Sequence, residues 1–408
     1  MPNRRYSFPN GHWNWPVQLT HHHAVRAGDL IFTGGQVDLT PEGVVRNIGD
    51  LHSQTANSMQ YMAELMADLD VSLSDLVKLV VYYTGDADDE AALLTQLADI
   101  IGHDTRPVIS LINNPELCYP GMRVEIEGVA MRAPNGDHIP RERHWLDDMP
   151  ALPKTFSHVL RAGGMIFASD ISARNADGTV AYPGDLPAQS ALTMQRLSRV
   201  MQTVGADTSD IVKVSTFYVG DGSVESWAEA ATIRANSFAN PGPAATGIPL
   251  PSFPHDDLMT KICATAVKAR EGTAPLNREY SWPKGHWDWT TPLPYKHGNK
   301  VGNVIHLGGQ VALNEQAEVL HPDDMVAQTR IAMDNIASVL AEFGATLDDV
   351  VKVTTFYQGS ASAEALHENL LIRSASYTAP GPATTGVPVA ELVYDQMVIE
   401  IEVIAIVE

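Results

Sequence analysis

Pairs of glutamates alternate with apolar residues in two similar stretches of the chain. Glu125 and Glu127 interrupt the run VEIEGVA at 124–130, and Glu400 and Glu402 interrupt IEIEVIA at 399–405. Successive side chains of a strand point to opposite faces, so each pair is predicted to share one face. A carboxylate whose pKa is raised by apolar surroundings can orient a water and act as a general base, which contributes about 10²–10⁴-fold to a rate.

A second interpretation stays open for these glutamates, as structural ion pairs with Arg123 or with a lysine of a neighbouring part of the chain. The ion-pair interpretation is stronger for Glu127 and Glu402 than for the other two. The corresponding middle stretch, TKICA at 260–264, has Lys261 in place of the first glutamate. This lysine could be a nucleophile if desolvation lowered its pKa, but an ion pair with a facing glutamate is the favoured interpretation. Cys263 beside it is expected to be a small core residue.

One strand-like stretch occurs three times and orders the chain around these residues. It reads VKLVVYYTG at 77–85, VKVSTFYVG at 212–220 and VKVTTFYQG at 351–359. Its β-branched and aromatic residues predict a strand. The lysines are 135 and 139 residues apart (213−78 and 352−213), a period typical of a small domain rather than of a solenoid repeat. We therefore predict three copies of one domain, at 1–134, 143–270 and 279–408, joined by short linkers at 134–143 and 271–279.

The elements before and after the recurring strand also repeat. Helices are predicted first at 51–69, 187–204 and 325–343, and again at 91–101, 227–238 and 363–376. A glycine turn precedes the first helix of the outer copies, as Gly34, Gly35 and Gln36 and as Gly308, Gly309 and Gln310. Adjacent glycines can leave backbone N–H groups free to bind a ligand anion, and a plain β-bulge is an equal alternative.

Six of the seven tryptophans lie in leads that open the copies: YSFPNGHWNW at 6–15, YSWPKGHWDW at 280–289 and the shorter HW at 144–145. We expect these leads to be aromatic lids that pack domain against domain. A role for His12 or His286 in a ligand pocket is the alternative. No metal site is expected, because one histidine per lead lacks ligand spacing. Of the run His21-His22-His23, only the first and last share a strand face, and we expect one pocket histidine there.

Composition narrows the function classes. The 408 residues are 44% hydrophobic and carry a formal net charge of −22, which argues against a nucleic-acid partner and an anionic membrane surface. No apolar run approaches the roughly 18 residues that a membrane span needs. Two cysteines without a CxxC pair suggest a reducing compartment. We expect a cytoplasmic protein without a cofactor or a metal.

In the order strand pair, helix, strand, helix and two strands, each copy resembles the RidA (YjgF, reactive-intermediate deaminase) family. The resemblance rests on TGGQ at 33–36, the Val-Lys strand, Thr105-Arg106 and VEIEGVA at 124–130, and on the third copy's matching stretches. It implies an α+β, chorismate-mutase-like domain and a family trimer. Here the trimer becomes an intramolecular pseudo-trimer around a central β core, monomeric or further self-associated, with ligand clefts between neighbouring domains.

The resemblance also implies an activity, the hydrolysis of an enamine or imine of a small carboxylated metabolite to a ketone and ammonia. Arg106 would grip the substrate carboxylate as a bidentate fork, and Glu125 and Glu400 would position the water. Tyr295 matches a pocket tyrosine of the family, with His21 and Phe156 in its place in the other copies. The residues of the two glycine turns would contact the substrate.

Departures from the family pattern limit the number of sites. The second copy has Ala245 aligned with the arginine and Lys261 in place of the glutamate, and the third has Thr384 aligned with the arginine. We therefore expect one competent cleft, or one principal and one partial cleft, at a seam involving the first copy. The alternative function is a non-catalytic protein that binds a small ligand or acts as a scaffold.

Overall fold

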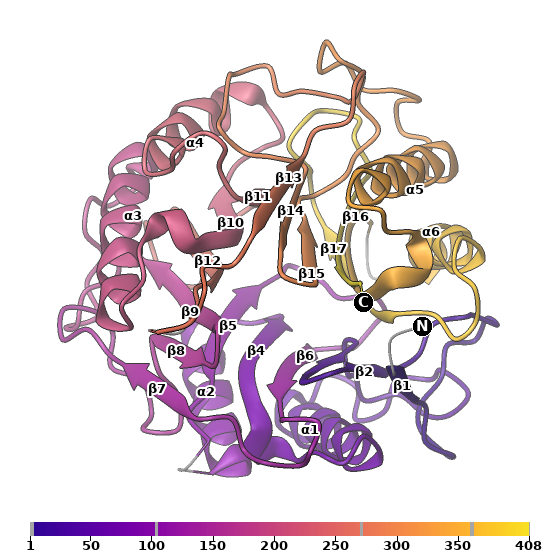
Figure 1. Ribbon diagram of the computed structural model, residues 1–408. Helices are drawn as coiled ribbons and strands as arrows, with labels where there is room; N and C mark the ends of the chain where they lie inside the picture. The colour runs from indigo at the N-terminus through magenta and orange to yellow at the C-terminus, as the bar shows by residue number, and fades with distance from the viewer. Residues whose placement is uncertain (1–3, 103–104, 270–271, 360–362, 408) are drawn as a thin grey trace.

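Three six-stranded sheets, each with two longer α-helices, make up the computed structural model (Figure 1). It describes residues 4–102, 105–269, 272–359 and 363–407. The predicted boundaries at Met1, Arg270 and Glu408, with Glu271 of the second linker, lie outside these residues. Among the described residues, no helix is long and apolar enough to cross a bilayer. The α+β class and the three-copy organisation predicted from the sequence are confirmed.

We refer to the residues spanned by each sheet as domains 1, 2 and 3. Domain 1 contains β1 (Arg4–Ser7), β2 (Ala24–Ala27), β3 (Leu30–Thr33), α1 (Leu51–Asp68), β4 (Leu76–Tyr83), α2 (Ala87–Ile101), β5 (Val108–Asn113) and β6 (Val124–Met131). Domain 2 contains β7 (Arg141–His144), β8 (Val159–Ala162), β9 (Met165–Ser172), α3 (Leu186–Thr203), β10 (Ile211–Val219), α4 (Ala228–Ala235), β11 (Ala244–Leu250) and β12 (Thr260–Val267). Domain 3 contains β13 (Arg278–Ser281), β14 (Gly298–Val301), β15 (Val304–Leu307), α5 (Met325–Glu342), β16 (Val350–Gln358), α6 (Ala363–Ala375), β17 (Ala383–Val389) and β18 (Ile399–Ile406). Short 3₁₀ turns at Leu73–Asp75, Thr208–Asp210, Val224–Ser226 and Leu347–Asp349 complete the described elements.

The strand order is the same in all three sheets. In domain 1 it is β1-β2-β3-β6-β4-β5, and the recurring strands β4, β10 and β16 pair in parallel with one neighbour and antiparallel with the other. The linkers contribute more structure than expected, because β7 and β13 begin within or directly beside them. Both strands extend a sheet by pairing antiparallel with β8 and β14, which satisfies their backbone groups.

The helices form where capping and apolar spacing agree. Asp50, Asp185 and Asp324 accept a backbone N–H at the start of α1, α3 and α5 respectively. In α1, the methionine-rich stripe predicted to be buried packs into the core of domain 1; it comprises Met59, Met62, Leu65 and Met66. The helices lie on the outside of the molecule and the sheets face inward (Figure 1).

Ring closure joins each domain to the next through its outermost strand. Isolated β-bridges link Val108 of β5 to Ser157, Ala244 of β11 to Lys296, and Ala383 of β17 to His22. Each bridge covers a sheet edge that would otherwise expose unpaired backbone groups. The three domains therefore form the predicted pseudo-trimer within one chain.

Buried ion pairs connect the domains at the centre of the ring. Lys213 Nζ lies 2.8 Å from Glu402 Oε2, and Lys352 Nζ lies 2.7 Å from Glu127 Oε2. A threonine hydroxyl of the lysine's own domain donates to the same carboxylate oxygen at 2.6 Å in both cases. The structure thus agrees with the ion-pair interpretation of Glu127 and Glu402.

The equivalent lysine of domain 1, Lys78, has no such partner, which allows a matched test. We expect Lys352→Met to lower the free energy of unfolding by about 3–5 kcal/mol, because Glu127 would remain buried and uncompensated. Lys78→Met should cost clearly less, since no described carboxylate lies within ion-pair distance of Lys78. Urea unfolding of both variants measures the difference, and equal losses would contradict the assigned role of the ion pair.

Candidate active site

Three clefts lie at the three domain seams. The 2–3 cleft encloses about 660 Å³ and includes Glu400 of domain 3 and Arg234 of domain 2. The 1–3 cleft is smaller, about 370 Å³, and includes Glu125 of domain 1 and Arg373 of domain 3. The 1–2 cleft encloses about 930 Å³ and includes Lys261 of domain 2. Each cleft therefore places the first position of the Glu-x-Glu pattern against a helix of the adjacent domain.

The second glycine of each glycine turn makes room for a cleft glutamate. A Cβ atom at Gly309 would fall 1.7 Å from Glu400 Oε1, and one at Gly35 would fall 1.8 Å from Glu125 Oε1. The first glycine instead allows the two domains to approach closely at the seam, because a Cβ at Gly308 would fall 2.5 Å from the carbonyl oxygen of Ala245. A side chain at Gly308 would clash with backbone, whereas one at Gly35 or Gly309 would force the cleft glutamate to move.

The glycine turns do not present free backbone donors. The N–H groups of Gly34, Gly35 and Gln36 donate to the carbonyl oxygens of His23, Thr384 and Ile126 respectively, and the turn at 308–310 is satisfied in the same way. The prediction that this turn binds a ligand anion through its N–H groups is therefore wrong for both copies. All of these donors are already used in holding the turn and the seam together.

Gln36 and Gln310 hold the tryptophan-rich leads in place. Gln36 Oε1 lies 2.9 Å from His12 Nε2 and accepts a hydrogen bond from Trp13 Nε1 at 3.2 Å. Gln310 makes the matching contacts with His286 and Trp287. The glutamines are fully buried, so they position the leads, whose tryptophans form cleft walls. His12 and His286 do not line the clefts.

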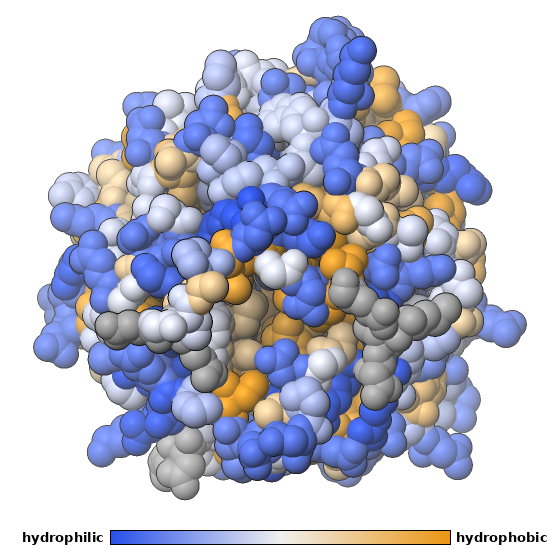
Figure 2. Space-filling view, viewed as in Figure 1, coloured by the Kyte–Doolittle hydropathy of each residue, from blue (hydrophilic) through white to orange (hydrophobic). Residues whose placement is uncertain are grey.

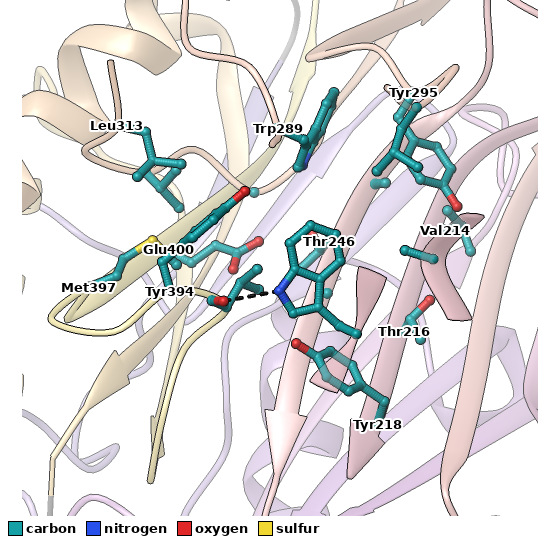
Figure 3. Close-up of a pocket in the computed structure, with 18 of the residues that line it drawn as sticks. Val214, Thr216, Tyr218, Thr246, Trp289, Tyr295, Leu313, Tyr394, Met397 and Glu400 are labelled. Carbon is teal, nitrogen blue, oxygen red and sulfur yellow. Dashed lines mark hydrogen bonds between the residues drawn. The ribbon is translucent and has the colours of Figure 1, made fainter. Parts of the chain in front are cut away.

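The two cleft glutamates are buried acids. Glu125 and Glu400 are each 5% exposed, and burial raises the pKa of both to about 8. Glu400 Oε2 has no hydrogen-bond partner among the described residues, and its carboxyl group points into the 2–3 cleft (Figure 3). At neutral pH both groups are mostly protonated, so each is a proton donor first and a base only after its proton has left.

Two buried arginines face the clefts from helices, and sequence analysis did not identify either. Arg234 is in the last turn of α4 and Arg373 in the last turn of α6, nine residues before a proline in both cases (243−234 and 382−373). Domain 1 has Ala98 at this spacing (107−98). A comparison of this nine-residue spacing to the proline across the three copies would have identified the two arginines.

The two guanidinium groups differ in how many of their donors are used. Arg373 donates twice to Asn369 Oδ1, at 2.8 and 3.0 Å, and once to Thr384 Oγ1 at 3.0 Å. The corresponding positions in domain 2 are Ala230 and Ala245, 139 residues earlier (369−230 and 384−245). In the described part of the chain, Arg234 donates from Nη1 to Ser190 Oγ at 3.1 Å and has the hydroxyl group of Tyr295 as a second hydrogen-bond partner. Of the five N–H donors of each guanidinium, Arg234 thus keeps more for a ligand than Arg373, which is held by the side chains of Asn369 and Thr384.

Arg106, the predicted carboxylate clamp, lies elsewhere. Strand register pairs Lys78 with Val108 in domain 1 and the equivalent Lys352 with Ala383 in domain 3. Val108 therefore corresponds to Ala383, and Ile109 corresponds to Thr384. Arg106 lies before the start of β5. Its guanidinium carbon lies 5.7 Å from the ring centre of Trp145, and it is not among the residues lining the three clefts. The predicted alignment of Arg106 with Ala245 and Thr384 is wrong. The expectation that the principal site involves domain 1 loses its basis with it.

Aromatic side chains from both domains wall the 2–3 cleft. Trp289 comes from the lead of domain 3, Tyr295 from the segment between that lead and β14, and Tyr218 from β10 of domain 2 (Figure 3). The hydroxyl oxygen of Tyr218 is buried without a hydrogen-bond partner among the described residues. Burial raises the pKa of Tyr295, and the nearby Arg234 opposes that rise. Tyr295 and Glu400, which the family resemblance suggested, therefore share one cleft.

The 1–3 cleft contains the matching glutamate in a tighter setting. Cys118 Sγ donates to the carbonyl oxygen of Gly386 at 2.8 Å and lies 3.9 Å from Glu125 Oε2. His21 packs behind this seam, with Nδ1 3.3 Å from the carbonyl oxygen of Pro382, and burial lowers its pKa to about 3. His21 is thus a neutral residue of the seam and does not line the cleft.

The 1–2 cleft has an ion-pair network in place of the acid. Lys261 Nζ lies 3.2 Å from Glu90 Oε2 and 3.1 Å from Asp170 Oδ2, and Glu90 Oε1 lies 2.8 Å from His255 Nε2. Although burial favours the neutral amine, the two carboxylates keep the pKa of Lys261 above its ordinary value. The pKa shift that a nucleophilic lysine requires is absent, and the favoured prediction of an ion pair across a seam agrees with the structure. Among the described residues, no cluster of histidine, cysteine or carboxylate side chains could hold a metal ion.

Comparison with known proteins places the chain in a family. A profile of the family described as Endoribonuclease L-PSP matches residues 17–132, 147–268 and 290–407. A RutC family protein of Pyrococcus abyssi is 34% identical over 112 residues, which cover 28% of this chain and 85% of the relative. The 2-iminobutanoate/2-iminopropanoate deaminase of Escherichia coli strain K12 is 32% identical over 113 residues, covering 28% and 87% respectively.

Among solved structures, a chorismatase crystal structure superposes with a TM-score of 0.54, covering 81% of this chain and 93% of the other at 13% identity. At this identity the likeness concerns the fold alone, and it extends over most of the ring. The profile matches three segments that together make up most of the sequence, one within each sheet-bearing part of the chain. The chain therefore belongs to the RidA/YjgF family, the Endoribonuclease L-PSP family of the matching profile, as three tandem copies within one polypeptide.

Proposed function

We propose that the protein hydrolyses a C–N bond of a small carboxylated metabolite, as an enamine or imine deaminase, with its principal site in the 2–3 cleft. The observation that carries the proposal is the pairing, in one cleft, of a buried carboxylic acid at Glu400 with the incompletely bonded guanidinium of Arg234. Relatives described as 2-iminobutanoate/2-iminopropanoate deaminase and as 3-aminoacrylate deaminase support the reaction class.

Arg234 would bind the substrate. A guanidinium presents a planar fork of N–H donors that matches a carboxylate, and burial strengthens such a bidentate pair. The aromatic walls suit a planar, conjugated carbon skeleton stacked against indole and phenol rings; they include Trp227, Trp287 and Trp289. The substrate would thus be anionic at one end and flat and apolar at the other.

Glu400 would move the protons. For an enamine, the carboxylic acid protonates the β-carbon, which converts the enamine to an iminium ion and leaves Glu400 as a carboxylate. The carboxylate then accepts a proton from a water that attacks the C=N carbon, so that a carbinolamine forms and the acid is restored. Transfer of that proton to the nitrogen lets the C–N bond break and ammonia leave, while the carbinolamine hydroxyl group returns its proton to Glu400, so that the ketone forms and the acid is restored. An imine substrate is first protonated on its nitrogen by Glu400 and then enters at the water step.

The 1–3 cleft is proposed as a partial site. Its arginine is held by Asn369 and Thr384, and its volume is little more than half that of the 2–3 cleft. Substrate binding there would require breaking charge-assisted hydrogen bonds that the protein already makes, which lowers the net gain from the carboxylate. The 1–2 cleft, with neither glutamic acid nor arginine at the matching positions, is proposed to be inactive.

Replacing Glu400 tests the assignment of the acid. We expect Glu400→Gln to lower kcat for ammonia release from an enamine generated in situ by about 10²–10⁴-fold, because glutamine can neither donate nor accept the proton. Glu125→Gln, the matched variant of the other cleft, should keep most of the activity. Coupled glutamate dehydrogenase measures the ammonia. A larger loss for Glu125→Gln would move the principal site to the 1–3 cleft. If the wild type releases ammonia no faster than buffer alone, the deaminase proposal fails and the ligand-binding alternative is favoured.

The pH dependence follows from the raised pKa of Glu400. The reactive form for an enamine is the protonated acid, so kcat/KM should be constant below about pH 7 and fall as pH rises through about 8. The variant Glu400→Gln should lose this inflection and keep only its residual rate. A pH profile recorded between pH 6 and 10 provides the measurement. A wild-type profile without an inflection between pH 6 and 10 would contradict a buried acid.

A double exchange tests why the two clefts differ. We expect Ala230→Asn with Ala245→Thr to raise KM by about 10–100-fold while kcat changes little, because the new side chains would bond to Arg234 as Asn369 and Thr384 bond to Arg373. The reverse exchange, Asn369→Ala with Thr384→Ala, serves as the matched control and should not raise KM. Initial-rate kinetics measure both, and an unchanged KM in the first variant would contradict the role of Arg234.

A further inference from the structure

A fourth cavity lies at the centre of the ring, separate from the three seam clefts. It encloses about 600 Å³, and the three equivalent lysines of the recurring strand, Lys78, Lys213 and Lys352, all line it. Along β10, Lys213 and Ser215 line this axial cavity, whereas Val214 and Thr216 line the 2–3 cleft. The centre of the face drawn in Figure 2 is recessed below a hydrophilic rim. Nothing in the proposed reaction uses this cavity.

Charge is unbalanced around the axis. Two of the lysines are neutralised at 2.7 and 2.8 Å by Glu127 and Glu402, which also line the cavity. The strand register places Cys263 opposite Ser215, where Glu402 lies opposite Thr354 and Glu127 opposite Val80. The third lysine–glutamate position, that of Lys78, therefore has a cysteine in place of the carboxylate. Cys263 Sγ donates to Ser110 Oγ at 3.2 Å, and burial raises the pKa of this thiol to about 11, so it supplies no counter-charge.

Lys78 is left without a counter-ion. Among the described residues, no hydrogen bond or ion pair involves its ammonium group, although it lies within the electrostatic reach of Cys263, His306 and Glu402. Two positive charges are cancelled by two negative ones, so the ionised groups lining the cavity sum to +1. A partly buried ammonium without a partner is costly, and an anion in the cavity would offset that cost.

Polar groups without partners accompany Lys78. Within the described part of the chain, the hydroxyl groups of Ser215, Thr265 and Thr354 line the cavity and make no side-chain hydrogen bond. His306 also lines it, and strand register gives this position to Phe32 in domain 1 and Phe167 in domain 2. The chain thus departs from its own three-fold pattern twice, by losing a carboxylate and by gaining an imidazole.

We propose that the axial cavity binds one small oxyanion, such as phosphate, sulfate or a short carboxylate, through the ammonium group of Lys78 and the unpaired hydroxyl groups around it. The anion takes the place of the carboxylate that Cys263 does not provide, and so gives Lys78 the counter-ion that Lys213 and Lys352 already have. The site is independent of the proposed deaminase activity, because it shares no lining residue with the seam clefts.

Titration calorimetry with inorganic phosphate tests the site on the full chain. The wild type is expected to bind one equivalent saturably, and Lys78→Met to lose affinity at least tenfold. Lys154→Met removes one charge from an exposed lysine and should bind as the wild type does. Arg234→Ala should also retain binding, which separates the axial site from the 2–3 cleft. Absence of saturable binding in the wild type, or equal affinity in Lys78→Met, would overturn the proposal. Loss of phosphate binding in Arg234→Ala, but not in Lys78→Met, would also overturn the proposal.

Cys263→Glu provides a second test, because this variant adds a charge beside Lys78 instead of removing one. It supplies the missing carboxylate, so it should abolish phosphate binding and raise the melting temperature measured without phosphate to that of the phosphate-saturated wild type. A crystal soaked in selenate should show anomalous density in the axial cavity of the wild type and none in Cys263→Glu. Density only elsewhere, or phosphate binding that survives in Cys263→Glu, would overturn the proposal.

Discussion

Closure of the ring is the constraint on which the rest of the structure depends. A single domain would leave its outermost strand unpaired, and one core cluster contains Phe217 of domain 2 and Phe356 of domain 3, so neither domain could bury it alone. The bridges from β5, β11 and β17 to the next domain remove both problems. Because the seams form by closure, every cleft combines a strand of one domain with a helix of another, and in the two clefts that have both a glutamic acid and a facing arginine these come from different domains.

Position within the ring also decides what each glutamate does. Glu400 and Glu402 are two residues apart on the same strand face, as the alternation predicts. Glu400 opens onto the 2–3 cleft, and burial raises its pKa to about 8 although the charge of Lys213 opposes that rise. For Glu402, burial acts in the same direction, but the contacts with Lys213 and Thr246 outweigh it and lower the pKa. A shift of two residues thus separates a proton donor from a structural anion.

The sequence was sufficient for the fold because its signals are repeated and local. The Val-Lys strand and the two predicted helices each occur in three copies, the alternating glutamate strand occurs in two, and all agree with one topology. The glutamates of the site were found by the same alternation. The partner arginines were not, because Arg234 and Arg373 resemble ordinary helix residues until the ring buries them. The family resemblance suggested Arg106 as the carboxylate-binding arginine, and only the strand register shows that it precedes the position in question.

Tethering the three domains changes what substitutions can do. In a homotrimer, one substitution alters three equivalent seams at once, so a lysine in place of the cleft glutamate would remove every site. In this chain the same change at Lys261 affects one seam, where Glu90 and Asp170 balance it. The 1–3 seam has kept its acid but bonds its arginine to Asn369, and the 2–3 seam has kept both groups with open donors. Each seam can therefore either hold two domains together or form a site, and the proposed reaction needs only one such site.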